Sequence, residues 1–148
     1  MSTHTRTRGR IALALVACAA LLSLGAPARL DASAESLNVT VKYTGKGQVD
    51  KDHRLWIWLF DSPDIGPGSM PIAEGSVDTN GGVATFEGLA NGQVWIAAAF
   101  DERGGFAGNS PPPPGAPIGI YGMEAGAPAP VKPGAEPVLS FDDSMRMP

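Results

Sequence analysis

Few side chains in this 148-residue sequence have the chemistry that a catalytic site needs. There is one cysteine, Cys18, and outside the first 34 residues there is a single histidine, His53. No Gly-x-Ser-x-Gly nucleophile elbow, zinc-ligand spacing or phosphate-binding loop occurs. His53 lies at the start of a predicted strand, where we expect an exposed histidine rather than a general base. The sequence therefore predicts a protein that is not an enzyme and has no cofactor.

Four acidic residues are the candidates for a metal site. Asp61 and Asp64 follow one predicted strand, and Asp101 and Glu102 follow another. Loops of a β-sandwich gather at its two ends, and calcium binds carboxylate and carbonyl oxygens on such loops. The Asp-x-Asp-x-Asp-Gly alternation of a local calcium loop is missing, and Arg103 adds a positive charge. Two interpretations therefore remain: the four acids bind calcium, or they are solvated loop residues without a ligand.

Three tryptophans are the candidates for a ligand-binding surface. Trp56 and Trp58 alternate with aliphatic residues in one predicted strand, and Trp95 does so in another. If the aliphatic side chains face the core, the three indole rings point to the opposite face. If the two strands are neighbours, these rings form one aromatic surface. Such a surface can bind a glycan or a protein partner.

Two alternatives to an open aromatic surface follow from the same residues. The prolines at 111–114 and Pro117 can lie over the tryptophan face, as proline-rich ligands lie in aromatic grooves. That arrangement explains the long loop and the surplus of aromatic residues together. In the second alternative, Trp56 and Trp58 lie in the core.

Short apolar runs with turn residues between them predict an all-β fold. Residues 37–43 alternate strictly between apolar and polar side chains, as in a half-buried strand. Residues 53–60 are apolar on both faces, which is typical of a covered strand. Residues 94–100 form the longest apolar strand, and residues 137–142 form a closing strand.

Two turns are predicted from glycine. Asn80-Gly81-Gly82 lies between residues 76–79 and 83–86, and Asn-Gly favours the type I′ turn of a β-hairpin. Residues 88–92 form a corner before the long strand. This corner predicts that Gly92→Val destabilises the fold more than Gly108→Val.

Residues 104–137 are predicted to be mostly loop. In this range 17 of 34 residues are glycine or proline, and proline cannot donate the N–H that a strand ladder needs. With five or six short strands and no helical periodicity, the chain is expected to form a single antiparallel β-sandwich of the Ig-like type.

Residues 79–97 resemble the carboxypeptidase regulatory-like, or transthyretin-like, β-sandwich domains. Phe86, Leu89 and Gly92 match the family's spacing, and Val94 stands where that family usually has tyrosine. Residues 100–105 and 116–122 are similar to segments of a bacterial family of secreted domains of unknown function. Both resemblances imply a β-sandwich without catalytic activity, and neither implies a particular ligand.

The N-terminus has the pattern of a secretory signal peptide. Three arginines lie in the first ten residues, residues 11–24 are apolar, and Ala-x-Ala sites follow at 26–28 and 32–34. These are the three regions of a cleavable signal, and the apolar run is too short for a membrane span. We expect cleavage after Ala34, export to the periplasm or the outside, and a domain of residues 35–148 without a membrane span.

Cys18 offers an alternative way of processing. The segment Leu15-Val16-Ala17-Cys18 resembles the lipobox of bacterial lipoproteins, in which the cysteine becomes lipidated. That reading predicts a lipid-anchored surface protein, and the other makes Cys18 an ordinary residue of the apolar run.

Charge narrows the class of partner. Residues 35–148 carry seven lysines and arginines against 14 acids, a net charge of −7. This excess argues against nucleic acid and anionic membranes as partners. The sequence predicts an exported binding or structural module, with a glycan or another envelope protein as the partner.

Overall fold

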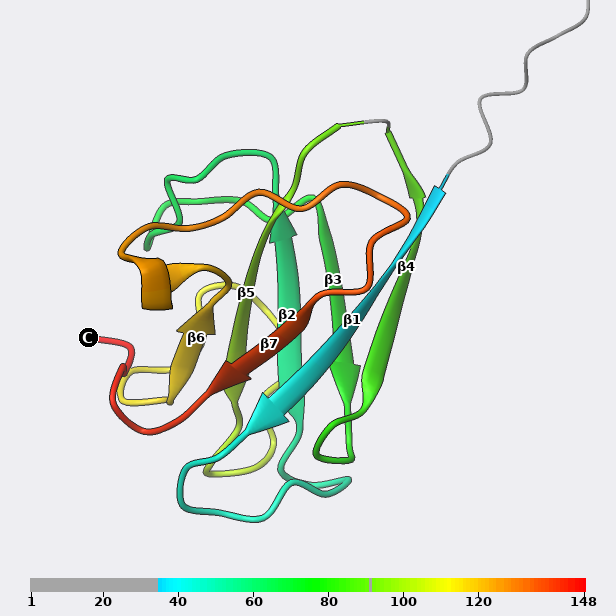
Figure 1. The fold of residues 1–148 in the computed structure, drawn as a ribbon. Coiled ribbons are helices and arrows are strands. Elements are labelled where there is room, and N and C mark those ends of the chain that lie inside the picture. The colour runs from blue at the N-terminus through cyan, green and yellow to red at the C-terminus, as the bar shows by residue number, and fades with distance from the viewer. Residues whose placement is uncertain (1–34, 91) are drawn as a thin grey trace, which may run out of the picture. The chain divides into compact units, whose positions relative to one another are not determined.

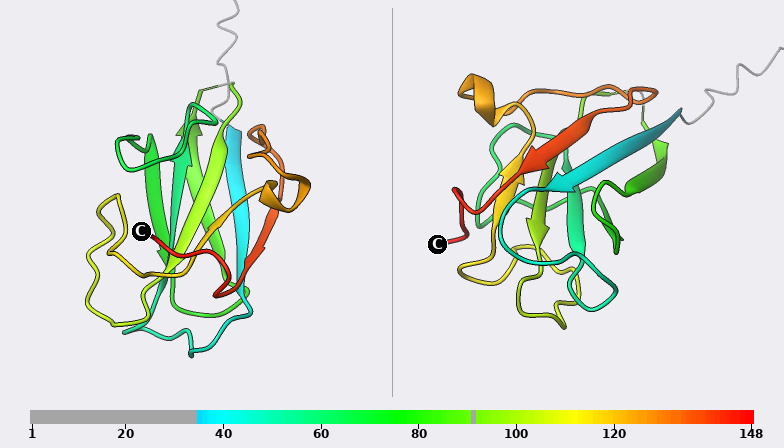
Figure 2. Two further views of the ribbon diagram at one scale, coloured as in Figure 1. Left: turned by 90° about the vertical axis from the view of Figure 1, so that its left-hand side faces the viewer. Right: turned by 60° about the horizontal axis from the view of Figure 1, so that its bottom comes forward.

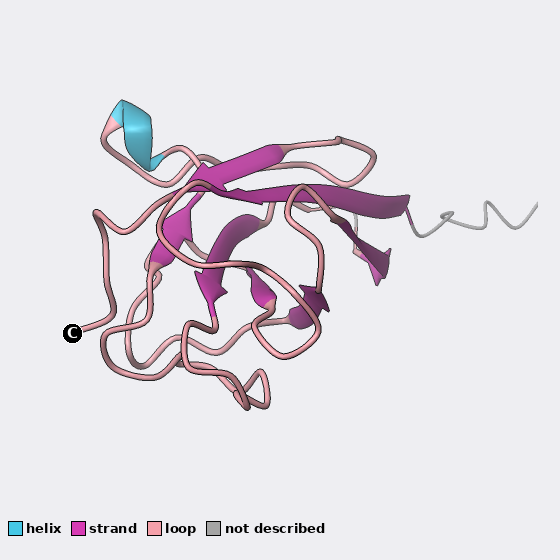
Figure 3. Ribbon diagram, turned by 90° about the horizontal axis from the view of Figure 1, so that it is seen from below, coloured by secondary structure: helices cyan, strands magenta, loops and turns pink. Residues whose placement is uncertain are grey.

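The computed structural model describes residues 35–90 and 92–148, which form seven strands in two sheets. The strands are β1 (Glu35–Tyr43), β2 (Leu55–Phe60), β3 (Ala73–Val77), β4 (Val83–Leu89), β5 (Trp95–Phe100), β6 (Ile118–Ile120) and β7 (Val138–Phe141). One helical turn, η1 (Met123–Ala125), is the only helix in this part of the chain (Figure 3). The all-β prediction is confirmed. The predicted signal peptide and Cys18 lie outside the described residues.

The two sheets have different strand directions. The four-stranded sheet has the order β3-β2-β5-β6 and is antiparallel throughout. The three-stranded sheet has the order β4-β1-β7, in which β1 is antiparallel to β4 and parallel to β7. The prediction of a purely antiparallel fold is wrong for this last pair. The long connection from β6 allows β7 to enter beside β1 in the parallel direction (Figure 1).

The apolar core lies between the facing sides of the two sheets. Alternation in β1 and β2 turns every second side chain inward, and the predicted inward faces of these strands and of β5 are confirmed. A single cluster of buried side chains joins the sheets, and its main members are Leu37, Val39, Val41, Leu55, Ile57, Leu59, Phe86, Ile96, Phe100 and Phe141. In the described part of the chain, no helix is long and apolar enough to cross a membrane.

The Asn-Gly turn connects two sheets instead of closing a hairpin. β3 pairs with β2 and β4 pairs with β1, so the strands on either side of the turn belong to different sheets. Gly82 donates to the carbonyl of Thr79 at 2.9 Å, and Gly81 alone has a positive φ, of 80°. This is the type II pattern, and the predicted type I′ hairpin is wrong.

The Asn80 side chain gives this turn its place in the fold. Its Oδ1 accepts from the Tyr43 amide at 2.8 Å, and its Nδ2 donates to the Tyr43 carbonyl at 2.7 Å. The side-chain amide therefore pairs with the end of β1 as a neighbouring strand would.

The Gly/Pro-rich segment 104–137 contains structure that the sequence did not predict. β6 and η1 lie within it, and Val131 forms an isolated bridge with Val94. Gly119 in β6 is essential to the packing, because a Cβ there would lie 2.5 Å from Cβ of Phe141 in β7. A strand of only three residues is too short to show an alternating pattern, and the prolines around it favoured the prediction of a loop.

Candidate functional site

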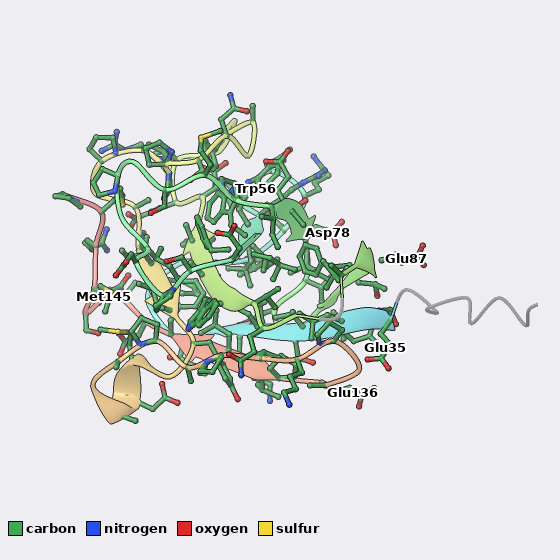
Figure 4. All side chains as sticks on the ribbon, turned by 90° about the horizontal axis from the view of Figure 1, so that it is seen from above. Glu35, Trp56, Asp78, Glu87, Glu136 and Met145 are labelled. Carbon is green, nitrogen blue, oxygen red and sulfur yellow. The ribbon has the colours of Figure 1, made fainter. Side chains whose placement is uncertain are left out.

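The side of the four-stranded sheet that points away from the three-stranded sheet, here called the outer face, carries the aromatic residues. β2 and β5 are neighbours, with Trp56 opposite Ala99, Trp58 opposite Ala97 and Phe60 opposite Trp95. The predicted adjacency of the two strands is confirmed. Because the alanines are small, they leave room beside the indole rings. Figure 4 shows Trp56 on this side, away from β1 and β7.

The outer face is covered. A second apolar cluster joins Trp58, Phe60, Ala97 and Ala99 to partly buried side chains, among them Ile65, Phe106 and Ile118. Trp58 is only 2% exposed, and its Nε1 donates to the carbonyl of Gly108 at 3.0 Å. An open surface of three tryptophans is therefore wrong for Trp58. The predicted proline cover matches the structure only in part, because Pro111 and Pro112 lie beside Trp58, whereas Pro113 and Pro114 line a separate pocket with Phe100 and Asp101.

The other two tryptophans differ from Trp58. Trp56 is partly buried and makes an edge contact with Phe106, with ring centroids 5.6 Å apart. The Trp56 indole N–H is buried and has no hydrogen-bond partner among the described residues. Trp95 is also partly buried. Neither side chain is a fully exposed platform.

Two residues hold the 101–117 loop against the outer face. Asp101 is 5% exposed, and its Oδ2 accepts from the Phe106 amide at 2.9 Å. Gly108 has φ of 90°, and a Cβ there would lie 2.1 Å from the Trp56 ring. A Cβ at Gly92 would come no closer than 3.8 Å to another residue, the Ala90 carbonyl. The physical basis for ranking Gly92 above Gly108 is therefore wrong.

A cavity of about 170 Å³ lies between the outer face and its cover. Its floor consists of strand side chains, namely Trp58, Phe60, Ala97, Ile118 and Ile120. Its walls come from three separate segments, with Ile65 and Pro67 before β3, Pro111 and Pro112 in the proline run, and Met147 and Pro148 at the C-terminus. Almost every lining side chain is apolar.

Most of these wall residues were missed in the sequence. The proline run was predicted to cover the tryptophans, and Pro111 and Pro112 do line the cavity beside Trp58. Ile65, Met147 and Pro148 lie in segments without a strand pattern. Their only signal is apolar character within otherwise polar loops, which does not indicate the partner of each residue.

The four predicted calcium ligands are not brought together. β2 and β5 are antiparallel, so the loop after β2 with Asp61 and Asp64 lies at the opposite end of the sheet from Asp101 and Glu102. Six strand residues separate the two pairs by about 20 Å. The Asp101 carboxylate already accepts a hydrogen bond from the Phe106 amide. Among residues 35–90 and 92–148, no three potential metal ligands form a group.

His53 lies at the same end of the sheet as Asp101, in a local hydrogen-bonded turn. Its Nδ1 is 3.0 Å from Asp50 Oδ1, and the two side chains are each 39% exposed. The pKa of Asp50 lies below its ordinary value because the backbone N–H of Asp52, and then the His53 ring, donate to the carboxylate. This pair stabilises the turn before β2.

A polar network lies at the edge of the fold where β1 and β7 end. The Tyr43 hydroxyl donates to Asp143, and the carboxylate of Asp143 also accepts from Arg146 Nη2 at 3.0 Å. Arg146 Nη1 donates to Glu102 Oε2 at 2.9 Å. The network thus connects β1, the loop after β5 and the C-terminal tail.

The whole chain was compared with known proteins. No protein-family model, curated protein or solved structure matches it.

Proposed function

We propose that residues 35–148 form an exported, non-catalytic β-sandwich module of the transthyretin-like kind that binds a small apolar ligand. The single observation that carries this proposal is the apolar cavity on the outer face, between Trp58 and the cover. The pocket is partly open to solvent and its lining is almost entirely apolar, so a ligand that enters it can bury apolar surface.

The size and lining of the cavity define the class of ligand. A dry apolar cavity of about 150 Å³ is known to take up benzene or xenon, and this one measures about 170 Å³. Pockets for drug-sized molecules are larger, at about 300–1,000 Å³. A single aromatic ring or a short alkyl chain fits, either as a free molecule or as one group of a larger one. A charged ligand is disfavoured, because the lining residues include no charged side chain that would offset its desolvation.

The glycan alternative has weaker support. Stacking of a sugar on the tryptophans would require the 101–117 loop to leave Trp58, whose indole N–H is bonded to that loop. Anchoring through Cys18 concerns the N-terminal segment and is independent of the cavity.

The proposal is tested by titrating residues 35–148 with toluene and following backbone amide shifts by NMR. Benzoate serves as the charged ligand of the same ring size. Ala97→Leu adds a side chain to the cavity floor, and Ala135→Leu adds the same side chain at an exposed site outside the lining. Thermal unfolding of both variants checks that they are folded.

We expect saturable toluene binding, with shifts centred on residues that line the cavity, and little response to benzoate. Ala97→Leu should weaken toluene binding about tenfold, equivalent to about 1.4 kcal/mol, and Ala135→Leu should leave it unchanged. If toluene causes no saturable shifts, or if both variants bind it like the wild type, the cavity is not a ligand site.

A further inference from the structure

We propose that the C-terminal segment of residues 145–148, here called the strap, is a latched gate over one side of the cavity. The ligand part of this inference rests on the proposed function, whereas the latch itself is tested without any ligand. Three observations carry it: how the strap is attached, what it covers and how Arg146 holds it.

The strap is attached as an extra edge strand. It runs antiparallel to residues 115–118, the last of which begins β6, and Arg146 forms an isolated bridge with Pro117. Met145 accepts from the Ile118 amide at 2.9 Å, and Met147 donates to the Ala116 carbonyl at 2.9 Å. Met147 also accepts from the Gly115 amide at 2.8 Å. Figure 2 (left) shows the red tail beside the yellow loop that contains these partners.

The strap forms one wall of the cavity. Met147 and Pro148 line it across from Pro111 and the strand side chains. All of the strap's backbone bonds go to residues 115–118, and the only strand among these partners is β6, through its first residue, Ile118. The strap can therefore move away without breaking any pairing between β2 and β5 or between β1 and β7.

Arg146 is the latch. Its Nη1 donates to Glu102 Oε2 at 2.9 Å and to the Gly115 carbonyl at 2.7 Å, and its Nη2 donates to Asp143 Oδ1 at 3.0 Å. One planar guanidinium thus reaches three segments at once, which a lysine ammonium cannot do with the same geometry. The group is 39% exposed, so the latch is held by several bonds of moderate strength.

The Arg146 bonds add to the strap's own backbone hydrogen bonds, so their loss changes how often the strap opens. Releasing Arg146 leaves three backbone bonds and the apolar contacts of Met147 and Pro148 to hold the strap. Its opening then becomes more frequent, which exposes the amides of Gly115 and Ile118 to solvent. The same opening gives a ligand a path to Trp58.

The test compares Arg146→Ala with Lys132→Ala, a matched removal of one exposed positive side chain at a distance from the strap. Hydrogen–deuterium exchange is measured at the amides of Gly115, Ile118 and Met147 in the ligand-free protein. Toluene exchange rates are then measured by NMR line-shape analysis. Met147→Pro is a second variant, which leaves the arginine in place and removes a strap donor together with one side chain of the cavity wall.

We expect Arg146→Ala to accelerate exchange at the amides of Gly115, Ile118 and Met147 by at least about threefold, as for the loss of exposed ion pairs. Core amides such as those of Ile57 and Ile96 should exchange at the wild-type rate. Toluene should dissociate faster from Arg146→Ala and from Met147→Pro, and Lys132→Ala should match the wild type.

The failures of the two proposals are distinguishable. If the amides of Gly115, Ile118 and Met147 exchange at the wild-type rate in Arg146→Ala, Arg146 does not hold the strap. Faster amide exchange with unchanged toluene rates would overturn the gate. Absence of toluene binding in every variant would overturn the proposed function and the gate together, and amide exchange would still decide whether Arg146 latches the strap.

Discussion

The Tyr43 hydroxyl donates a hydrogen bond to Oδ1 of Asp143, with 2.5 Å between the two oxygens, and joins residues that lie 100 positions apart. The Tyr43 ring stacks on Phe100 with centroids 4.4 Å apart. The other carboxylate oxygen accepts from the Lys46 amide at 2.8 Å. The Asp143 side chain, next to the strap, is therefore bonded both to Tyr43 in the core and to the loop after β1.

Protonation states on both sides of this bond favour the observed arrangement. Burial, and then the bond to Asp143, raise the pKa of Tyr43 far above its ordinary value. The Tyr43 hydroxyl, and then the Lys46 amide, lower the pKa of Asp143. Both shifts favour a neutral phenol beside a charged carboxylate.

Tyr43→Phe should lower the melting temperature by several degrees, because it removes a charge-assisted bond while keeping the ring stacked on Phe100. The control is Tyr121→Phe, which deletes the same atom from a tyrosine that packs at the edge of the core. Equal losses in the two variants, measured by calorimetry at pH 7, would contradict a special role for the bond.

The difference between wild type and Tyr43→Phe should depend on pH. A depressed carboxylate pKa contributes stability above the ordinary value of 3.8 and loses it as the pH falls through the lower folded pKa. A raised phenol pKa contributes stability below 10.0 and loses it as the pH rises further. The difference in melting temperature should therefore be greatest between these values and shrink at both extremes. A constant difference from pH 2 to pH 11 would refute this assignment.

Gly108→Ala should destabilise the domain far more than Gly92→Ala. The first variant combines a strained positive φ with a Cβ only 2.1 Å from the Trp56 ring, at a cost of about 2–4 kcal/mol. The second meets no close neighbour, and we expect a change below about 0.5 kcal/mol. Urea unfolding measures both values, and comparable losses would show that Gly108 does not contact Trp56 as described.

Asn80→Ala should cost about 1–2 kcal/mol, since two hydrogen bonds to the Tyr43 backbone are lost. Asn80→Asp keeps the acceptor and loses the donor, so its stability should fall between those of wild type and Asn80→Ala. Asn109→Ala, at another exposed loop position, is the control. If Asn80→Ala unfolds at the same urea concentration as Asn109→Ala, the turn does not anchor the end of β1.

Asp101→Ala should loosen the cover over the tryptophans. The variant leaves the Phe106 amide without its acceptor, and the Phe106 ring lies against both Trp56 and Trp58. Acrylamide should therefore quench tryptophan fluorescence more strongly than in wild type. Asp61→Ala removes an exposed carboxylate at the other end of the sheet and should leave quenching unchanged. Unchanged quenching in Asp101→Ala would mean that other contacts hold the loop.

Local patterns in the sequence predicted the strands but not how they pair. The alternation from Leu37 to Tyr43 and the two apolar faces of β2 are properties of adjacent residues, and both agree with the structure. Asn80-Gly81 indicated a reversal of the chain correctly. It could not indicate that the next strand joins the other sheet, because that choice depends on pairing with β1, in which Val83 lies opposite Thr40.

The candidate site was only half predictable for the same reason. Alternation placed Trp56, Trp58 and Trp95 on one face, and the proline run was recognised as a possible cover. The walls of the cavity, however, include Ile65 and Met147, which lie 82 positions apart in the chain. Tertiary contacts at that separation leave no periodic signal in a single sequence.

The most direct test of the central claim is a set of intermolecular nuclear Overhauser effects between toluene and the domain of residues 35–148. The proposed ligand site predicts contacts from the toluene ring to the indole of Trp58 and to the methyl groups of Ala97 and Ile118, all of which line the cavity. Contacts confined to exposed apolar side chains such as Met70, which is 82% exposed, would contradict it, as would the absence of any contact at saturating toluene.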